Sequence, residues 1–315
     1  MIVITGAAGF IGSCLAAYLN SQGFTDLVLV DDFSRTDKRK NYQGKAHTHM
    51  VARNALPNWL RANEQRVQTI VHLGARTDTM ETDERIFQEL NLSYSQTVWK
   101  LCAAYQIPLI YASSAATYGD GAEGFSDDAA TTACLKPLNA YARSKHAFDC
   151  WALEQAEAPY FWAGLKFFNV YGPNEYHKGR MASVVWHAYQ QIQETGQLKL
   201  FRSYREDYAD GEQRRDFIYV GDIVRIQRKH SGLYNAGTGQ ARSFLDLGRA
   251  VFTAMGREPV IEFIDMPEGL RESYQYFTEA PMDKLRQSGV AFEATSLENG
   301  IQHYVQEYLM PQLYW

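Results

Sequence analysis

Short apolar runs alternate along this chain with longer stretches in which apolar residues recur every three or four positions. Short apolar runs are typical of buried strands, and the longer periodic stretches are typical of amphipathic helices. Strands are predicted at residues 2–5, 27–30, 68–73, 109–112 and 161–166, and helices at about 85–105 and 140–154. Alternation of this kind predicts an α/β fold with a doubly wound parallel sheet, covered by helices on both faces. The polar stretch 34–66 is too weakly periodic to assign.

The pattern changes after residue 166 and predicts a second, smaller α/β lobe. A turn is expected at 168–173, a helix at about 181–195, strands near 199 and at 216–220, a return strand and glycine turn at 232–239, and a helix at 296–309. The larger unit is expected to comprise residues 1–167 and about 214–240. The smaller lobe is expected to comprise about 168–213 and 241–315.

A glycine-rich turn joins the first predicted strand to the first helix. Gly6, Gly9 and Gly12 have G-x-x-G-x-x-G spacing, and the helix that follows carries apolar residues on one face. Glycine permits the tight backbone path and lets a pyrophosphate approach the amides at the helix N-terminus. The position therefore favours a dinucleotide site in a Rossmann-type sheet over an ordinary glycine-rich turn.

Composition narrows the class of protein. The chain has 315 residues and a formal net charge of −5, which argues against a general nucleic-acid binder because phosphate backbones are bound by positive charge. The four cysteines are scattered without C-x-x-C spacing, so neither a disulfide framework nor a thiolate zinc site is indicated, and a reducing cytoplasm fits. They are Cys14, Cys102, Cys134 and Cys150.

No targeting, membrane or metal-binding segment is expected either. The first strand begins at Ile2, with no basic stretch before an apolar run, which argues against a cleaved signal. The run 2–19 contains three glycines and polar residues, which is atypical of a membrane span. His47 and His49 have a spacing that a metal could use, but no third ligand is evident.

A second group of residues predicts acid–base chemistry. Tyr141 and Lys145 are four residues apart in a predicted helix and so share one face. A neighbouring ammonium and an oxidised nicotinamide both favour the phenolate form of tyrosine. Ser114 ends a predicted strand at the carboxyl edge of the sheet, where ligands of doubly wound folds bind. Its hydroxyl is expected to hold the substrate oxygen that Tyr141 deprotonates. Alone, Y-x-x-x-K is as often a surface helix pair.

Together these motifs resemble those of extended short-chain dehydrogenases/reductases that act on nucleotide sugars. Segments 111–119, 168–184, 214–222 and 274–278 further resemble the ADP-L-glycero-D-manno-heptose 6-epimerase family, over nearly the whole chain. The most specific part is His-Lys-Gly-Arg-Met-Ala-Ser at 177–183. Two regions depart from that family: the segment after Asp222 is shorter than the expected helix, and 202–213 is longer.

The resemblance implies a reaction in lipopolysaccharide core-sugar biosynthesis. Members of the family bind NADP, oxidise the C6 hydroxyl of an ADP-linked heptose to a ketone, and return the hydride to the opposite face. Tyr141 would serve one face and Lys178 the other, although a lysine by itself is more often a solvated loop residue. The resemblance also implies a homo-oligomer, a pentamer, and the composition described above favours a cytoplasmic protein without nucleic-acid or membrane partners.

The resemblance further assigns binding residues. For substrate they are Asn169, Arg180, His187, Phe201, Arg215 and Tyr274, with Arg180 standing where a small hydroxyl residue is expected. For the cofactor, the glycine turn, the strand ends and the resemblance together give Gly6, Gly9, Phe10, Ile11, Gly12, Asp31, Asp32, Lys38, Arg53, Gly74, Ala75, Asn91, Lys145 and Val170.

The residues themselves leave the choice between NAD and NADP open. Asp31 and Asp32 end the second strand, where a carboxylate commonly accepts from the ribose 2′-hydroxyl and favours NAD. Basic residues at 35 and 38–40 follow at once and could neutralise a 2′-phosphate, or form a solvated basic run. The resemblance assigns Lys38 and Arg53 to the phosphate, so NADP is expected.

Other functions remain open on the sequence. A related 4-epimerase or a net reductase would share these motifs. A 4,6-dehydratase would normally carry acidic residues just after the serine strand, and residues 115–117 are Ala-Ala-Thr. A non-catalytic dinucleotide sensor would be expected to have lost Tyr141 or Lys145, and both are present.

Overall fold

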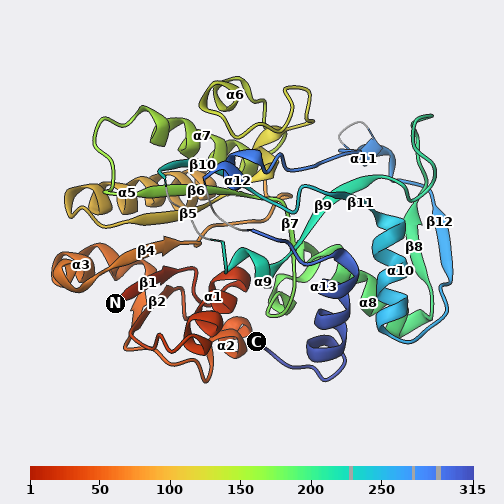
Figure 1. Ribbon diagram of the computed structural model, residues 1–315, viewed down its shortest axis with the longest axis horizontal. Coiled ribbons are helices and arrows are strands. Elements are labelled where there is room, and N and C mark those ends of the chain that lie inside the picture. The colour runs from red at the N-terminus through yellow and green to blue at the C-terminus, as the bar shows by residue number, and fades with distance from the viewer. Residues whose placement is uncertain (227–229, 272–273, 289–291) are drawn as a thin grey trace.

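A seven-stranded parallel sheet forms the larger part of the molecule (Figure 1). The computed structural model describes residues 1–226, 230–271, 274–288 and 292–315. The strand order is β10-β6-β5-β4-β1-β2-β3, and every neighbouring pair is parallel. In chain order the strands are β1 (Ile2–Thr5), β2 (Leu27–Asp31), β3 (His49–Ala52), β4 (Thr69–His72), β5 (Leu109–Ser114), β6 (Trp162–Phe167) and β10 (Gly232–Ala236).

Helices cover both faces of this sheet. On one face, α3 (Leu56–Arg61), α5 (Tyr94–Ala104) and α7 (Ala140–Glu154) pack around the buried Trp99. On the other, α1 (Phe10–Ser21) packs its Ala16 against the fully buried Ile4 and Leu29. Figure 1 shows α7 above the strands and α2 (Arg39–Tyr42) below them. A sheet buried on both faces explains why its strands are almost entirely apolar.

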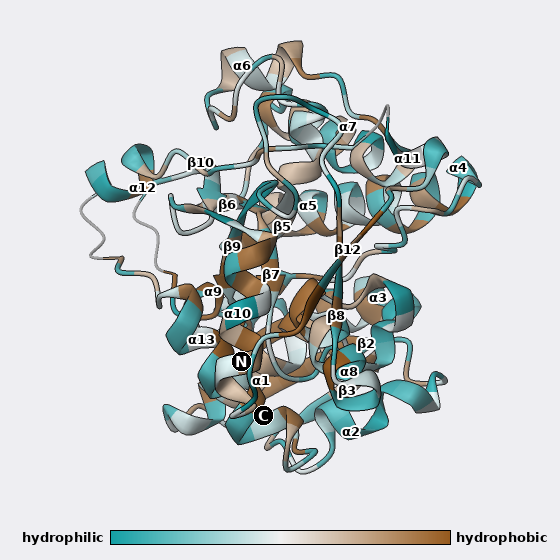
Figure 2. Cartoon of the chain, turned by 90° about the vertical axis from the view of Figure 1, so that its right-hand side faces the viewer, coloured by the Kyte–Doolittle hydropathy of each residue, from teal (hydrophilic) through white to brown (hydrophobic). Residues whose placement is uncertain are grey.

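A smaller lobe lies at the other end of the molecule (Figure 1). It contains a three-stranded sheet in the order β11-β9-β7 and the parallel pair β12-β8. Its strands are β7 (Asn169–Tyr171), β8 (Leu198–Phe201), β9 (Arg214–Tyr219), β11 (Ala241–Ser243) and β12 (Ile261–Ile264), and its main helices are α8 (Val184–Thr195), α10 (Phe244–Ala254) and α13 (Leu297–Tyr304). Figure 2 shows the hydrophobic residues concentrated inside, between more hydrophilic outer helices.

Shorter helices complete the chain. They are α4 (Glu84–Phe87), α6 (Ala129–Cys134), α9 (Val220–Ile223), α11 (Glu268–Arg271) and α12 (Asp283–Gln287). A π-helical segment (Gln88–Ser93) joins α4 to α5, so the helix predicted at 85–105 is one continuous rod with a wider middle turn. Among the described residues, no helix is both long enough and apolar enough to cross a membrane.

The structure confirms the predicted α/β class and adds two corrections. The turn predicted at 168–173 is partly wrong, because β7 pairs with β9 through residues 169–171. The unassigned stretch 34–66 contains β3, the edge strand that pairs with β2. Its more buried residues alternate with exposed ones. The helix α9 ends at Ile223, one residue after Asp222, and residues 227–229 of the segment that follows lie outside the described residues. The division into two domains stays a prediction.

Candidate active site

A cavity of about 700 Å³ opens at the carboxyl edge of the parallel sheet, between the sheet and the smaller lobe's first loop. Of the residues predicted from the sequence, those that line it are Gly6, Gly9, Phe10, Ile11, Gly12, Asp31, Asp32, Lys38, Arg53, Gly74, Ala75, Ser114, Tyr141, Lys145, Asn169, Val170 and Lys178. The structure thus brings together residues that are up to 172 positions apart, as Gly6 and Lys178 are. Asn91, Arg180, His187, Phe201, Arg215 and Tyr274 do not line it.

The glycine turn forms a cradle that fits a dinucleotide. Gly6 has a φ of +68°, and a Cβ there would lie 2.7 Å from the backbone of Gly74. A Cβ on Gly12 would lie 2.2 Å from the carbonyl oxygen of Gly6, so the first turn of α1 can approach the strand end only without one. The first turn of α1 therefore lines the cavity, and a helix N-terminus in this position suits a pyrophosphate.

Acidic and basic side chains meet at one end of the cavity. The buried carboxylate of Asp31 accepts from the Ala8 amide at 2.9 Å and forms an ion pair with Lys38 at 3.2 Å. The hydroxyl and amide of Ser34 donate to Asp32 and are the main reason that the pKa of this carboxyl is lowered. Arg53 and Lys38 lower that pKa further by their charges. Both carboxylates thus already have partners within the chain.

The predicted acid–base group assembles around the end of β5. Burial raises the pKa of the Tyr141 phenol, and a hydrogen bond with the Ser114 hydroxyl acts against that rise. The ammonium of Lys145 donates to the Ala112 carbonyl at 2.8 Å, and burial lowers the pKa of Lys145 to about 8. The Ser114 hydroxyl thus favours the phenolate form of Tyr141, and the same role for Lys145 stays a prediction.

Lys178 reaches the same cavity from the loop after β7. Its ammonium lies 5.3 Å from the ring centroid of Phe10, the first residue of α1. Burial lowers the pKa of Lys178, while the carboxylate of Glu175 raises it. Glu175 is fully buried and accepts from the hydroxyl of Ser183 at 2.7 Å, which ties the loop to the start of α8. The loop lysine is thus half-buried and lines the cavity.

Asn91 does not line the cavity but contacts a residue that does. It is buried, accepts from the Arg76 amide at 2.8 Å, and donates to the Arg76 carbonyl and the Ser144 hydroxyl, each at 2.9 Å. It therefore braces Arg76, which does line the cavity, against helix α7. The cavity-lining residues Arg76, Thr77, Asp78 and His177 were not predicted. The first three follow β4, so the rule that ligands bind at the carboxyl ends of strands could have found them.

Three of the remaining predicted residues form a separate cluster in the smaller lobe. The guanidinium of Arg215 lies 5.4 Å from the ring centroid of Tyr274, and the rings of Tyr274 and Phe201 meet edge to face at 6.3 Å. Arg180 is exposed and forms an ion pair with Asp78 at 3.0 Å, and the imidazole of His187 contacts the Arg180 carbonyl at 3.3 Å. The structure thus places these five residues in two groups outside the cavity.

The described residues contain no group of three or more metal-ligating side chains placed to hold an ion. The Nδ1 atom of His47 contacts the Lys45 carbonyl at 2.7 Å, and His49 packs against Trp59 with 5.6 Å between ring centroids. The two histidines therefore make separate local contacts.

Comparison with known proteins identifies the family. The model of the NAD dependent epimerase/dehydratase family matches residues 2–236, which include the glycine turn, Ser114, Tyr141, Lys145 and Lys178. The chain belongs to this family. It is an epimerase, because relatives that match it over 98% of both chains carry that name.

Two relatives of this epimerase are called ADP-L-glycero-D-manno-heptose-6-epimerase. The protein from Nitratidesulfovibrio vulgaris (strain DP4) is 49% identical and that from Fusobacterium nucleatum is 46% identical, each over 98% of both chains. The crystal structure of the Helicobacter pylori protein of the same name superposes on this epimerase with a TM-score of 0.81 at 27% identity. That match covers 97% of this chain and 95% of the other. The similarity thus spans both the parallel sheet and the smaller lobe.

Proposed function

We propose that this epimerase interconverts ADP-D-glycero-D-manno-heptose and ADP-L-glycero-D-manno-heptose with NADP as cofactor. The observation that carries the proposal is the meeting of two proton-transfer groups, Tyr141 and Lys178, in one cavity with a dinucleotide cradle. The names of relatives at 46% and 49% identity support the sugar. Inversion requires that the hydride return to the opposite face of the C6 carbonyl, and a second acid–base group, Lys178, would serve the C6 oxygen once the exocyclic end of the sugar has turned over.

The reaction proposed is oxidation of the C6 hydroxyl to a ketone, followed by reduction from the other face. A nicotinamide dinucleotide supplies the hydride chemistry when bound. Ser114 would hold the C6 oxygen by its hydroxyl while Tyr141 takes the proton, as a general base does. Lys145 would fix the end of β5 through Ala112 and contribute positive charge. Lys178, whose pKa burial lowers, would then exchange the proton on the opposite face.

The charged end of the cavity supports NADP over NAD. A free carboxylate at the end of the second strand would favour the ribose 2′-hydroxyl of NAD, but Asp31 already binds the Ala8 amide and Lys38. Lys38 and Arg53 both line the cavity there and bring positive charge for a 2′-phosphate. The observed partners of Asp31 therefore weaken the argument for NAD that its position alone suggests.

The cluster in the smaller lobe is proposed to hold the ADP part of the substrate. Aromatic rings stack on an adenine, and a guanidinium suits a diphosphate, so Phe201, Tyr274 and Arg215 offer matching chemistry. Asn169, at the start of β7, lines the cavity and would contact the sugar. Arg180 and His187 lie on the loop and helix next to Lys178 and would contact the substrate from that side. The enzyme is further proposed to be a cytoplasmic homo-oligomer with two domains divided as the sequence predicts.

A direct assay tests the proposal. The protein is incubated with ADP-D-glycero-D-manno-heptose and the sugar is followed by proton NMR, with UDP-glucose as the comparison substrate. The expected result is conversion of the heptose to a mixture of both C6 epimers without net consumption of NADPH. Conversion of UDP-glucose alone would overturn the assigned substrate, and consumption of NADPH in proportion to product would identify a reductase instead.

A further inference from the structure

A buried ion pair lies beneath the active-site cavity without lining it. The ammonium of Lys166, on β6, lies 3.0 Å from a carboxylate oxygen of Asp149, on α7, and both side chains are 0% exposed. A buried pair of this kind is weak evidence for stability, because its desolvation cost can exceed its attraction and an apolar pair of similar volume is often as stable. The two charged groups can also form directional hydrogen bonds. Their hydrogen-bond partners show which parts of the active site they hold in place.

Asp149 ties helix α7 to strand β5. One carboxylate oxygen accepts from the Ser113 hydroxyl at 2.6 Å, and the other accepts from the Tyr111 phenol at 3.1 Å. Asp149 stands one helical turn after Lys145, on the same face of α7. Two successive turns of the helix that carries Tyr141 are therefore attached to β5, by Lys145 and by Asp149.

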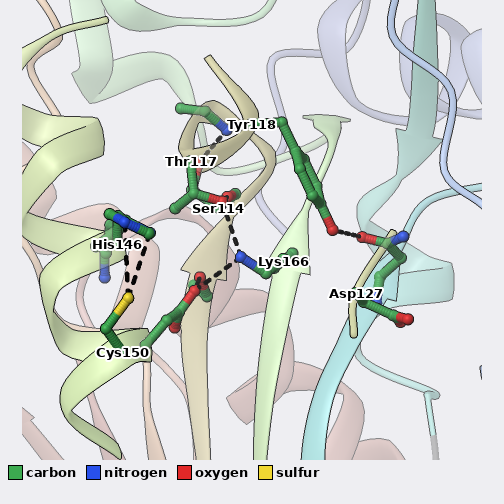
Figure 3. A network of polar contacts seen from close by, with 12 residues as sticks. Ser114, Thr117, Tyr118, Asp127, His146, Cys150 and Lys166 are labelled. Carbon is green, nitrogen blue, oxygen red and sulfur yellow. Dashed lines mark hydrogen bonds and ion pairs between the residues drawn. The ribbon is translucent and has the colours of Figure 1, made fainter. Parts of the chain in front are cut away.

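Lys166 fixes the other side of the same strand end. Its ammonium donates to the Thr117 hydroxyl at 2.9 Å, and that hydroxyl donates in turn to the carbonyl of Ser114 at 2.8 Å. Figure 3 shows Lys166 between Thr117 and Tyr118, with Ser114 above it. The ammonium also lies 4.9 Å from the ring centroid of Tyr118. Lys166 is thus linked to the backbone of the serine that binds Tyr141.

The contacts together hold three successive residues of β5. The Ala112 carbonyl is held by Lys145, the Ser113 hydroxyl by Asp149, and the Ser114 carbonyl by Thr117 and, through it, Lys166. Small displacements of reacting groups are costly, and a misplacement of about 1 Å can lower a rate about 100-fold. A strand end held at each of three residues is a means of preventing such displacements.

We propose that Asp149 and Lys166 are positioning residues that fix Ser114, Tyr141 and Lys145 relative to one another for the proton-transfer step. The inference rests on the proposed function for the reaction it serves, and on the hydrogen bonds above for the geometry. Asp149 has a second effect, because its negative charge raises the pKa of both Lys145 and Tyr141. Removing that charge therefore has a titration signature that a merely structural role does not have.

The main test is the double variant Asp149→Asn/Lys166→Met. Asparagine keeps one acceptor oxygen, and its amide group can donate to the other of the two hydroxyls, of Ser113 and Tyr111; methionine fills most of the lysine volume without leaving a lone buried charge. We expect kcat for epimerisation to fall by about 10- to 100-fold, while KM and NADP affinity stay within about threefold of wild type. Wild-type kcat in this variant would overturn the proposal.

A second measurement does not depend on the sugar. The titration of Lys145 is followed by NMR of ¹³Cε-labelled lysine, with its resonance assigned from a Lys145→Met variant. The wild-type midpoint is expected near pH 8, and the double variant is expected to titrate at lower pH. If the wild-type protein does not convert the heptose, the proposed function is wrong. The titration would still measure how far the charge of Asp149 raises the pKa of Lys145. An unchanged midpoint would overturn the coupling.

Two single variants control for folding and for nonspecific effects. Thr117→Val keeps the ion pair but cuts the link from Lys166 to the Ser114 carbonyl, and we expect kcat to fall several-fold with the Lys145 midpoint unchanged. Tyr118→Phe removes only the 2.7 Å hydrogen bond to Asn235, at the far side of the network, and should match wild type. Should the double variant not fold, a wild-type kcat in Thr117→Val overturns the proposal, as does an equal loss in Tyr118→Phe.

Discussion

The ammonium of Lys178 lies 5.3 Å from the ring centroid of Phe10, although 167 residues separate the two in the chain. Phe10 begins the helix whose N-terminus forms the dinucleotide cradle, so this contact places the loop lysine at the cofactor end of the cavity. The ring also covers the ammonium, and burial lowers the pKa of the lysine. A surface lysine would have neither property, so Lys178 is suited to exchange protons there.

The first prediction concerns Lys178→Met, which keeps the length and packing of the stem but removes the amine. Interconversion of the two heptose epimers, measured by NMR, should fall by about 10²- to 10⁴-fold. A 6-aldehyde analogue that cannot epimerise should still be oxidised and reduced when Tyr141 is intact. The control is Lys40→Met, an exposed lysine outside the cavity. Wild-type interconversion by Lys178→Met would exclude the second proton-transfer role.

The second prediction concerns Tyr141→Phe, which keeps the half-buried ring and removes the phenolic oxygen that interacts with Ser114. General acid–base groups contribute about 10²- to 10⁴-fold, and epimerisation should fall by that factor while NADP stays bound. The kinetics are read by NMR and the bound nucleotide by chromatography of the extracted cofactor. Activity within a few-fold of wild type would show that another group accepts the proton.

The third prediction concerns the choice of cofactor. Lys38→Ala and Arg53→Ala each remove positive charge next to Asp32 and should weaken NADP binding about tenfold or more, with little effect on NAD. Lys40→Ala serves as a matched control from the same basic run, outside the cavity. Binding is measured by calorimetry with both nucleotides. Equal losses for NAD and NADP would mean that neither side chain reads the 2′-phosphate.

The fourth prediction tests the glycine cradle. In Gly12→Ala the new Cβ would stand 2.2 Å from the Gly6 carbonyl oxygen, so the turn or α1 must shift. NADP affinity should fall at least about tenfold, because the amides of α1 move away from the pyrophosphate. Gly269→Ala, where a Cβ meets nothing within 4 Å, is the control. Unchanged affinity in Gly12→Ala would place the pyrophosphate elsewhere.

The fifth prediction concerns stability against pH. His72 is buried between the hydroxyls of Thr5, at 2.6 Å, and Ser95, at 2.9 Å, and burial lowers its pKa to about 3. The unfolded chain binds a proton at this histidine below about pH 6.5, whereas the folded chain does not. Its contribution to stability is therefore complete above that pH and is lost as the pH falls toward 3.

Urea unfolding at pH 7 and pH 5 measures that loss. Between the folded and unfolded pKa values of such a histidine, the free energy of unfolding falls by about 1.4 kcal/mol for each unit that the pH is lowered. His72→Gln, which keeps polar partners for both hydroxyls, should lose about 2 kcal/mol less than wild type between the two values. His177, whose pKa burial lowers to about 4, still titrates in both proteins. The exposed His47→Gln is the control. Equal losses in the His72 variant and wild type would contradict the assignment.

The sequence by itself determined the features that depend on neighbours along the chain. The glycine turn, the strand before it and the helix after it follow from the backbone freedom of Gly6 and the periodicity of α1, and Tyr141 and Lys145 share a face because of helical spacing. The edge strand β3 was missed because it has only one buried residue, Val51, and so carries almost no hydrophobic signal.

Only the tertiary structure decided which distant residues meet. Strand order, the placement of Lys178 over Phe10 and the pairing of Lys166 with Asp149 depend on contacts between segments far apart in the chain. Burial then shifts the pKa values: spacing places Lys145 and Tyr141 on one face of α7, and the fold adds the hydrogen bond from Lys145 to the Ala112 carbonyl and the Ser114 hydroxyl that acts on the Tyr141 phenol. The physical reason is that desolvation and hydrogen bonding at a site depend on everything packed around it, which local sequence does not contain.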